Sequence, residues 1–330
     1  MEFFNPYIHL PMYDLICLVL IVIGFAGNGL SLFVYTRPSM RKSTVSFFLN
    51  SLSVCNILYY TVTSQLYDIL RYSTKKLFFF LPDEMRAFVG TYEPDLHNWI
   101  VPQTLVTIGR YICVLIAIER WIAVCWPLKV RIWCTFRNCK IALLLIIVIV
   151  CGTHAPWYYI WFTGLTFARK HPFLFLILFV PEFLLSYLVA SWITDIIIPF
   201  VIMFFFNLKV ILQLRKSRLA RAQLTSTHRN TDKTTLMLIT VTFLFALCHS
   251  VDVVNGITYK YDLYLNSNQR NLLMGLTRIL AYTHTVITFL IYYCFSSKFR
   301  AILHSSIRGF FGQLARRMKK SRKSLNPIFV

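Results

Sequence analysis

The stretch ERWIAVCWPLK at residues 119–129 decides the fold, because it places an acid and an arginine at the end of a long apolar run. Charge is costly at membrane depth, and ionisable residues found there usually serve a function. The alternative is an interfacial anchor, in which Arg120 extends its charged end to lipid headgroups. The motif favours the functional interpretation.

The rest of the sequence is also strongly apolar. Hydrophobic residues make up 57% of the chain and the mean hydropathy is +0.60, whereas apolar residues make up a little under half of a typical soluble domain. Windows of about 20 apolar residues, enough to cross a bilayer, lie near residues 13–35, 46–70, 97–125, 139–162, 187–212, 235–258 and 272–296. We therefore predict an all-α membrane protein, with a bundle of seven transmembrane helices at residues 13–296.

Charge sets the expected orientation of this bundle. Lys and Arg follow the first, third, fifth and seventh spans, while acids such as Asp83 and Glu93 lie in the other loops. The positive-inside rule then places the N-terminus outside and the C-terminus in the cytoplasm. Residues 1–12 become an extracellular segment, too short to bind a ligand alone, and residues 297–330 become a cytoplasmic basic tail. We expect a multi-pass protein of the plasma membrane.

The basic tail and the net charge of +21 are both explained by contact with a membrane surface. Over residues 300–311, apolar residues give one side of a helix among basic residues, a pattern that predicts a short interfacial helix after the seventh span. The positive charge indicates attraction to anionic membrane lipid. It is therefore no evidence for nucleic-acid binding, although the chain meets a basic-charge criterion.

Several motifs occur in the order found in one receptor family. They are the acid-Arg-aromatic sequence with Pro127-Leu128, Gly27-Asn28 in the first span, Pro199 in the fifth, and Tyr292 before Phe299 in the seventh. Together they resemble the rhodopsin-like (class A) G-protein-coupled receptors. Within that family, residues 119–129, 234–238 and 289–300 are most similar to invertebrate FMRFamide-type neuropeptide receptors.

The resemblance implies a coupling site at the cytoplasmic end. Glu119 would hold Arg120 at rest, and Arg120 would meet a heterotrimeric G protein when the sixth helix moves outward. Trp121 replaces the usual Tyr of the motif. Pro127-Leu128 would seat the second loop against the G protein, and Tyr292 is the part of the seventh-helix signature that the chain keeps. Such a site is a two-state element biased by ligand.

The chain also departs from the family pattern. The usual outer disulfide is not expected, because its third-helix position is Asp95 and residues 163–187 contain no cysteine. Pro102 stands where amine receptors carry an Asp, so an amine ligand is not expected. Asn56 replaces an Asp that helps to bind sodium, which predicts weak or absent sodium sensitivity. An interhelical hydrogen bond is the favoured role for Asn56, with Asn28 as the candidate partner.

Two further polar residues lie within the predicted spans. Arg110 lies ten residues before Arg120, about 15 Å deeper in the membrane, and needs a partner there. Asp195 is the first candidate and Asp252 the second, and both a structural pair and a switch or ligand role remain open. His249 occupies the place of the family's sixth-helix tryptophan, where a hydrogen-bonded core residue is more frequent than a pH sensor.

Polar groups in the outer halves of the helices are the candidates for ligand binding, since bundle sites are built where such groups converge. They are Gln103, Thr107, Asp195, Asp252, Asn255, Arg278, Tyr282 and His284. A peptide ending in Arg-Phe-amide offers a cation for Asp252 or Asp195 and an aromatic ring for the many aromatic side chains. Alternatively, Asp252 and Arg278 pair with each other.

Other classes of protein find less support. We see no catalytic triad, phosphate-binding loop or metal-ligand cluster, so no enzyme, cofactor or metal is expected. A transporter would show internal repeats or broken helices, and we find no repeat. A chemosensory serpentine receptor for a small molecule remains the alternative within receptors, because several family signatures are lost.

Overall fold

The computed structural model describes residues 11–63, 101–170, 190–222, 239–240, 243–244, 247–248, 250–251, 254, 267–306 and 308. In sequence order, the helices with defined bounds are α1 (Pro11–Tyr35), α2 (Thr44–Thr63), α5 (Val101–Cys125), the short α6 (Val130–Trp133), α7 (Phe136–Lys170), the π-helical turn η3 (Ile193–Ile197), α10 (Ile198–Ala222) and α12 (Ser267–Phe295). The expected sixth span is described only in part.

Five helical spans within the described residues are long and apolar enough to cross a membrane. They are Leu15–Tyr35, Thr44–Thr63, Val101–Cys125, Phe136–Pro156 and Ala190–Ser217. Gly275–Phe295 meets the same criterion when it is joined to the helix Ser297–Ser306, which is turned by 96° from it. The prediction of a helical membrane bundle is therefore confirmed.

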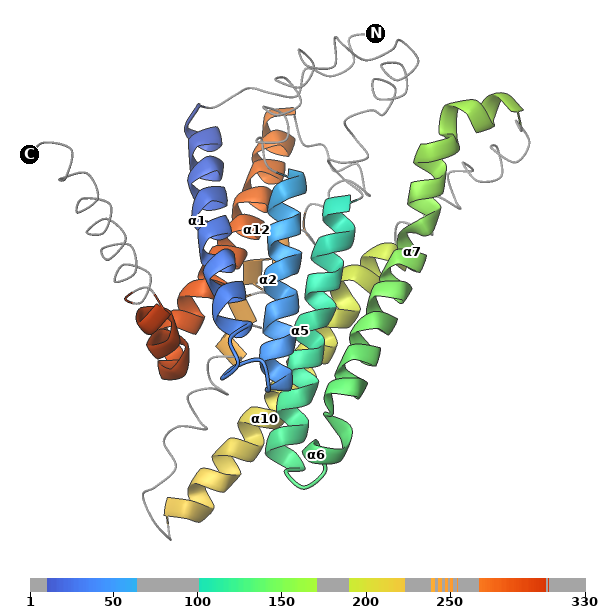
Figure 1. Ribbon diagram of the computed structural model, residues 1–330. Coiled ribbons are helices and arrows are strands. Elements are labelled where there is room, and N and C mark those ends of the chain that lie inside the picture. Colours follow the sequence, from blue (N-terminus) through green and yellow to red (C-terminus); the bar gives the residue numbers. More distant parts are fainter. Residues whose placement is uncertain are drawn as a thin grey trace, which may run out of the picture.

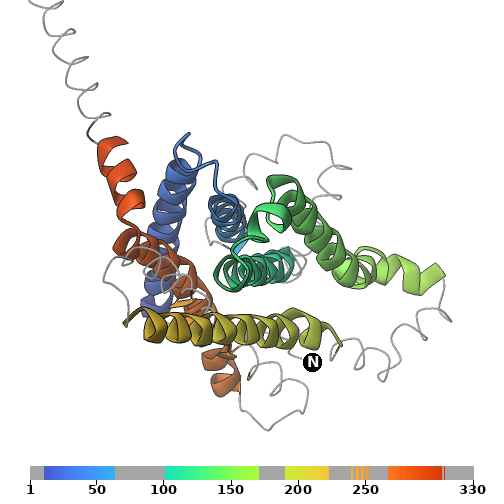
Figure 2. The ribbon, with the colours of Figure 1, turned by 90° about the horizontal axis from the view of Figure 1, so that it is seen from below.

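The bundle is organised around α5. This helix contacts α2, α7 and α10, while α1 packs against α2 and α12 (Figures 1 and 2). The outward faces of α7 and α10 expose large apolar side chains such as Leu144, Val148 and Phe204. A soluble protein rarely leaves so much contiguous apolar surface uncovered, so these faces suit contact with lipid.

Two glycines allow α1 to pack closely on its neighbours. A Cβ built on Gly24 would collide with the ring and hydroxyl of Tyr60 on α2, and one on Gly27 would lie 2.8 Å from Phe289 Cγ on α12. A Cβ on Gly29 would meet nothing within 4 Å. Small residues at helix contacts are how membrane helices approach each other without a hydrophobic driving force between them.

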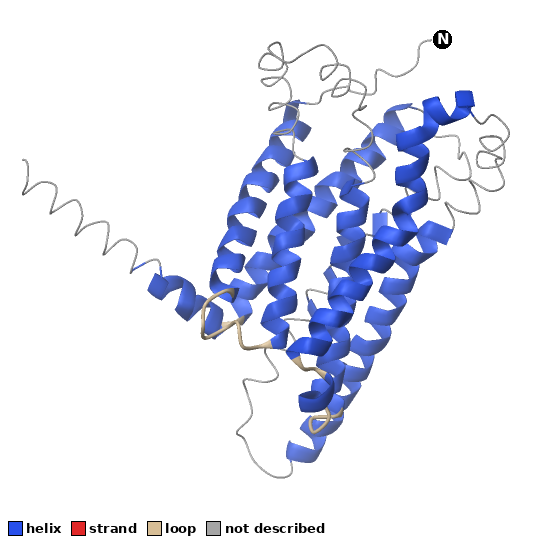
Figure 3. Cartoon of the chain, turned by 45° about the vertical axis from the view of Figure 1, so that its right-hand side comes forward, coloured by secondary structure: helices blue, strands red, loops and turns tan. Residues whose placement is uncertain are grey.

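One end of the bundle carries many exposed basic side chains, and we call it the basic end. Arg37 and Arg41 lie there in the connection from α1 to α2, and Lys129 and Arg131 lie in the connection from α5 to α7. Both connections lie at the same end of the bundle in Figure 3. Two of the loops that the sequence assigns to the cytoplasm are therefore together in space.

The turn after α12 also lies at the basic end and is held by specific bonds. Ser296 Oγ accepts a hydrogen bond from the Phe299 main-chain N–H at 3.2 Å, as an N-cap residue does. Arg300 Nη1 donates to the carbonyls of Tyr293, at 2.7 Å, and Cys294. These bonds satisfy carbonyls at the end of α12, while Phe299 is fully buried.

Candidate functional site

The acid and arginine that open the sequence argument lie at the last turns of α5, at the basic end. Glu119 is 6% exposed and accepts a hydrogen bond from the Thr44 hydroxyl at the start of α2. Its second oxygen, Oε2, has no hydrogen-bond partner among the described residues. Arg120 is half-buried, interacts electrostatically with Glu119, and leaves Nε without a hydrogen-bond partner within the same residues.

The residues that follow Glu119 and Arg120 have two kinds of surroundings, a contact between helices and an exposed loop. Trp121 packs its ring against Phe206 of α10, with ring centroids 5.0 Å apart. Pro127 is exposed, and Leu128 is 87% exposed. Leu128 therefore projects from the basic end, while Trp121 links α5 to α10.

Tyr292 lies in an aromatic cluster between α1 and α12. Its ring contacts Tyr35, with centroids 5.8 Å apart, and Phe299, with centroids 6.5 Å apart. The side chain is 1% exposed, and its hydroxyl has no hydrogen-bond partner within the described part of the chain. A buried hydroxyl without a partner carries a cost, so an alternative arrangement that supplies an acceptor would be favoured.

Asn28 and Asn56 form the interhelical bond that the sequence predicts. Asn56 Nδ2 donates to Asn28 Oδ1 at 3.0 Å, and Asn28 Nδ2 donates to the Gly24 carbonyl at 2.9 Å and approaches the Thr285 carbonyl at 3.5 Å. Both side chains are buried. The pair therefore joins α1, α2 and α12.

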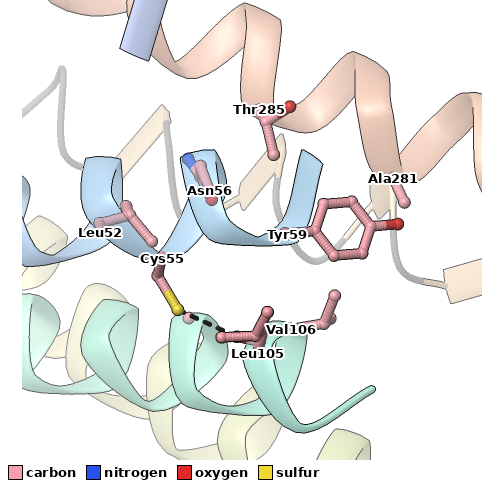
Figure 4. A pocket seen from close by; sticks show the side chains of 9 residues that line it. Leu52, Cys55, Asn56, Tyr59, Leu105, Val106, Ala281 and Thr285 are labelled. Carbon is pink, nitrogen blue, oxygen red and sulfur yellow. Dashed lines mark hydrogen bonds between the residues drawn. The ribbon is translucent and has the colours of Figure 1, made fainter. Parts of the chain in front are cut away.

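A cavity of about 20 Å³ lies beside this pair, between α2, α5 and α12. Figure 4 shows Asn56 and Thr285 among the apolar side chains around it, including Leu52 and Leu105. Cys55 Sγ lies against one wall and donates to the Leu105 carbonyl at 3.2 Å. The volume suffices for about one water molecule and is far too small for a peptide or an odorant.

Arg110 reaches Asp195, but it does so through the main chain. Arg110 is 1% exposed, and its Nη1 donates to the Asp195 carbonyl at 3.1 Å. In an α-helix that carbonyl would accept from the N–H of residue 199, and Pro199 has none. The adjacent Thr194 carbonyl accepts from the Tyr111 hydroxyl at 2.8 Å. The side chains of α5 thus satisfy carbonyls in the π-helical turn, a kind of distortion that is frequent at functional sites.

The Asp195 carboxylate contacts a residue that the sequence analysis missed. His154 Nε2 of α7 lies 3.2 Å from Asp195 Oδ2, and each residue is 4% exposed. Gln103 Nε2 lies 3.5 Å from the same oxygen. A histidine within the apolar fourth span was the available signal, because a titratable group inside a membrane span needs a partner.

The other candidate ligand residues fall into separate surroundings. Thr107 is fully buried on α5, and its hydroxyl has no hydrogen-bond partner among the described residues. Tyr282 stacks on Tyr60, with centroids 5.6 Å apart, and donates to the Thr63 carbonyl at 3.1 Å. His284 is buried with its Nε2 3.5 Å from the Thr288 hydroxyl, and Arg278 is exposed on α12. Asp252, Asn255 and His249 lie outside the described residues.

The cysteines and potential metal ligands show no further centre in the described parts of the chain. All nine cysteines are free thiols. No group of three or more His, Cys, Asp or Glu side chains comes together in a way that could hold a metal ion within the described residues.

These features define a helical multi-pass membrane protein with an acid-arginine pair at its basic end. Residues 97–292 match the family model of the seven-transmembrane receptors of the rhodopsin family. The chain belongs to this family, and is a receptor and not an enzyme. Residues 15–174 also match the model of the serpentine chemoreceptors of the Srw type.

Two curated relatives are similar over most of the chain. The FMRFamide peptide receptor frpr-18 of Caenorhabditis elegans is 30% identical over 307 residues, which cover 87% of this chain and 67% of the relative. The FMRFamide receptor of Drosophila melanogaster is 24% identical over 307 residues, which cover 87% of this chain and 53% of that relative. The resemblance drawn from the sequence motifs is confirmed. The chain spans about two thirds and about half of the lengths of these relatives.

Proposed function

We propose that this chain is a plasma-membrane receptor for an extracellular neuropeptide of the FMRFamide type, and that it activates a heterotrimeric G protein at its basic end. The observation that carries the proposal is the 30% identity to the Caenorhabditis elegans FMRFamide peptide receptor across 307 residues. In this orientation the N-terminus is extracellular and the basic end faces the cytoplasm, as the positive-inside rule requires.

The surroundings of Arg120 support the coupling role. Glu119 is held by Thr44 at the start of α2, and Arg120 Nε is left without a hydrogen-bond partner within the described residues. An arginine that is half-buried and incompletely satisfied gains hydrogen bonds when an acceptor arrives. We propose that the G protein supplies that acceptor, and that the exposed Pro127 and Leu128 add apolar contact beside it.

The contacts of Trp121 and Tyr292 support their assignment to the same switch. Trp121 packs on Phe206 of α10, so a movement of α10 changes the surroundings of the Arg120 turn. The Tyr292 hydroxyl is buried without a described hydrogen-bond partner. Trp121 is thus placed to respond to a movement of α10, and Tyr292 to favour an arrangement that supplies an acceptor, as a ligand-biased equilibrium needs.

Peptide binding is assigned to the other half of the bundle. Gln103, Thr107 and Asp195 lie on the inner faces of α5 and η3, and Tyr282 and His284 lie on α12. Asp252, Asn255 and Arg278 complete the proposed set. The Asp195 carboxylate matches the arginine of an Arg-Phe-amide peptide in charge, and the aromatic side chains of the bundle match its phenylalanine.

The helix Ser297–Ser306 is proposed to lie in the membrane interface. It turns by 96° from the preceding membrane span, which is the orientation that an interfacial helix needs. Lys298 is exposed and its Nζ donates to the Ser39 carbonyl at 2.9 Å. Together with the basic tail, this helix would attract anionic lipid of the cytoplasmic leaflet.

A G-protein activation assay in cells tests the proposal. Cells expressing the chain are challenged with a library of amidated peptides ending in Arg-Phe. Arg120→Ala and the control Arg41→Ala, which removes an exposed arginine at the same end, are compared at matched surface levels. We expect a response that Arg120→Ala abolishes and Arg41→Ala retains. Silence of a receptor demonstrated at the surface, or equal signalling by Arg120→Ala, contradicts the proposal.

A chemosensory receptor for a small molecule is the second candidate. The match of residues 15–174 to the Srw chemoreceptor model favours it. The same assay separates the two, because a chemosensory receptor would respond to a panel of small odorants and ignore the amidated peptides.

A further inference from the structure

His154 and Asp195 bring two ionisable side chains together in the middle of the bundle. His154 belongs to α7 and Asp195 to η3, and His154 Nε2 lies 3.2 Å from Asp195 Oδ2. Both side chains are almost completely buried. The two atoms are at ion-pair distance without a well-directed hydrogen bond between them, so the attraction depends on whether His154 carries a charge.

The other ring nitrogen of His154 fixes where the protons must lie. Nδ1 lies 2.8 Å from the Val150 carbonyl oxygen. A carbonyl only accepts, so Nδ1 carries a proton. In a neutral imidazole Nε2 would then present a lone pair to a carboxylate oxygen 3.2 Å away, and the contact would be repulsive. The observed contact is therefore attractive only when His154 holds a second proton.

Polar side chains surround the Asp195 carboxylate. Gln103 Nε2 lies 3.5 Å from Asp195 Oδ2, and the Thr194 hydroxyl lies 3.4 Å from Oδ1. Arg110 of α5 donates to the Asp195 carbonyl and brings a permanent positive charge nearby. The two neutral donors and the nearby guanidinium are placed to attract the carboxylate oxygens.

Among the described residues, Arg110 and Tyr111 of α5 are the other charged or titratable groups that interact with the pair. Tyr158 lies one turn after His154 on α7, and its hydroxyl lies 3.0 Å from that of Thr104. A tyrosine is ordinarily neutral and an arginine charged near neutral pH. Among these residue types, histidine is the one that ordinarily changes its charge between about pH 5 and 8.

We propose that His154 and Asp195 form a proton-binding site that clamps α7 to η3. A proton from solvent binds His154 Nε2 and makes the imidazolium that attracts Asp195. Its release leaves a lone pair facing the carboxylate and weakens the clamp. Because η3 continues directly into α10, the clamp ties the position of α10 to proton binding. The inference does not depend on the identity of the ligand.

The test is the melting temperature of the purified full chain in detergent between pH 5.5 and 8.5. We expect the wild-type melting temperature to fall as the pH rises through the range in which imidazole loses its proton. His154→Gln should lower the melting temperature at low pH and flatten this dependence. The control His304→Gln changes an exposed histidine on the helix Ser297–Ser306 and should leave the dependence intact.

Asp195→Asn provides a second variant, because it removes the negative charge that attracts the protonated His154. We again expect the melting temperature to depend less on pH. A wild-type profile that stays flat, or a profile of His154→Gln that follows the wild type, overturns the proposal. If neither variant yields folded protein, the comparison of wild type with His304→Gln decides. If the melting temperatures of the wild type and of His304→Gln both fall as the pH rises, the result supports the clamp. If His304→Gln no longer shows the fall, the titrating group is His304 and the clamp proposal is refuted.

Discussion

Replacement of Gly24 by Ala tests how closely α1 and α2 pack. A Cβ at this position would collide with the ring of Tyr60, which is completely buried. Tyr60 cannot easily move aside, since its hydroxyl contacts that of Thr285 and lies 3.2 Å from the Tyr282 carbonyl. The added methyl group must therefore push the two helices apart or force strain into the ring.

Gly29→Ala supplies a matched control for the size of this effect. It lies in the same helix, and its Cβ would meet nothing within 4 Å. Both substitutions gain the helix preference of Ala over Gly, about 0.8–1.0 kcal/mol, so that gain cancels in the comparison. Overpacking costs about 1–3 kcal/mol. We therefore expect Gly24→Ala to be less stable than Gly29→Ala by about 1–3 kcal/mol.

The assay is thermal or denaturant unfolding of the two purified variants in the same detergent. Gly29→Ala should unfold at or above the wild-type midpoint, and Gly24→Ala should unfold below that of Gly29→Ala. Equal midpoints for the two variants would refute the close approach of α1 to α2 at Gly24.

Three further predictions follow from buried contacts. In a double-mutant cycle of Asn28→Ala and Asn56→Ala, unfolding should show a favourable coupling of about 0.6 kcal/mol and at most about 1.7 kcal/mol; additive effects would mean that the hydrogen bond contributes nothing. Because Asn56 offers an amide in place of a carboxylate, agonist binding in sodium chloride and in choline chloride should be the same, and a clear sodium effect would contradict this. Phe299→Ala should cost about 3–5 kcal/mol in unfolding, whereas Leu128→Ala should stay within about 0.5 kcal/mol; a mild effect at Phe299 would argue against its burial.

The sequence predicts how deep a residue lies in the membrane better than it predicts which side of its helix contacts a neighbouring helix. The spacing of ten residues between Arg110 and Arg120 places the first at mid-bundle, and the structure brings Arg110 to Asp195. The contact with the main chain was not predictable from residue types, because it depends on a carbonyl that Pro199 leaves without its usual donor.

The pairing of Asn28 with Asn56 was predictable, since a buried amide within a membrane span needs a hydrogen-bond partner on a neighbouring helix. His154 was missed because the sequence of an apolar helix with a single histidine does not show how the helix is rotated about its axis. The partner of the histidine therefore could not be predicted. The separation of Tyr282 from Asp195 has the same origin. A list of polar residues in the outer halves of the helices does not say whether each points to the bundle centre or to the neighbouring helix.

Direct binding of an Arg-Phe-amide peptide to the purified chain tests the central claim most directly. A fluorescent peptide and the same peptide with a free carboxyl end are titrated against the wild type and Asp195→Asn, with folding verified by the melting transition. The account predicts saturable binding of the amidated peptide, weaker binding of the free acid, and a loss of affinity in Asp195→Asn. Absence of saturable binding to folded wild-type protein would contradict the claim that this is a receptor for such peptides.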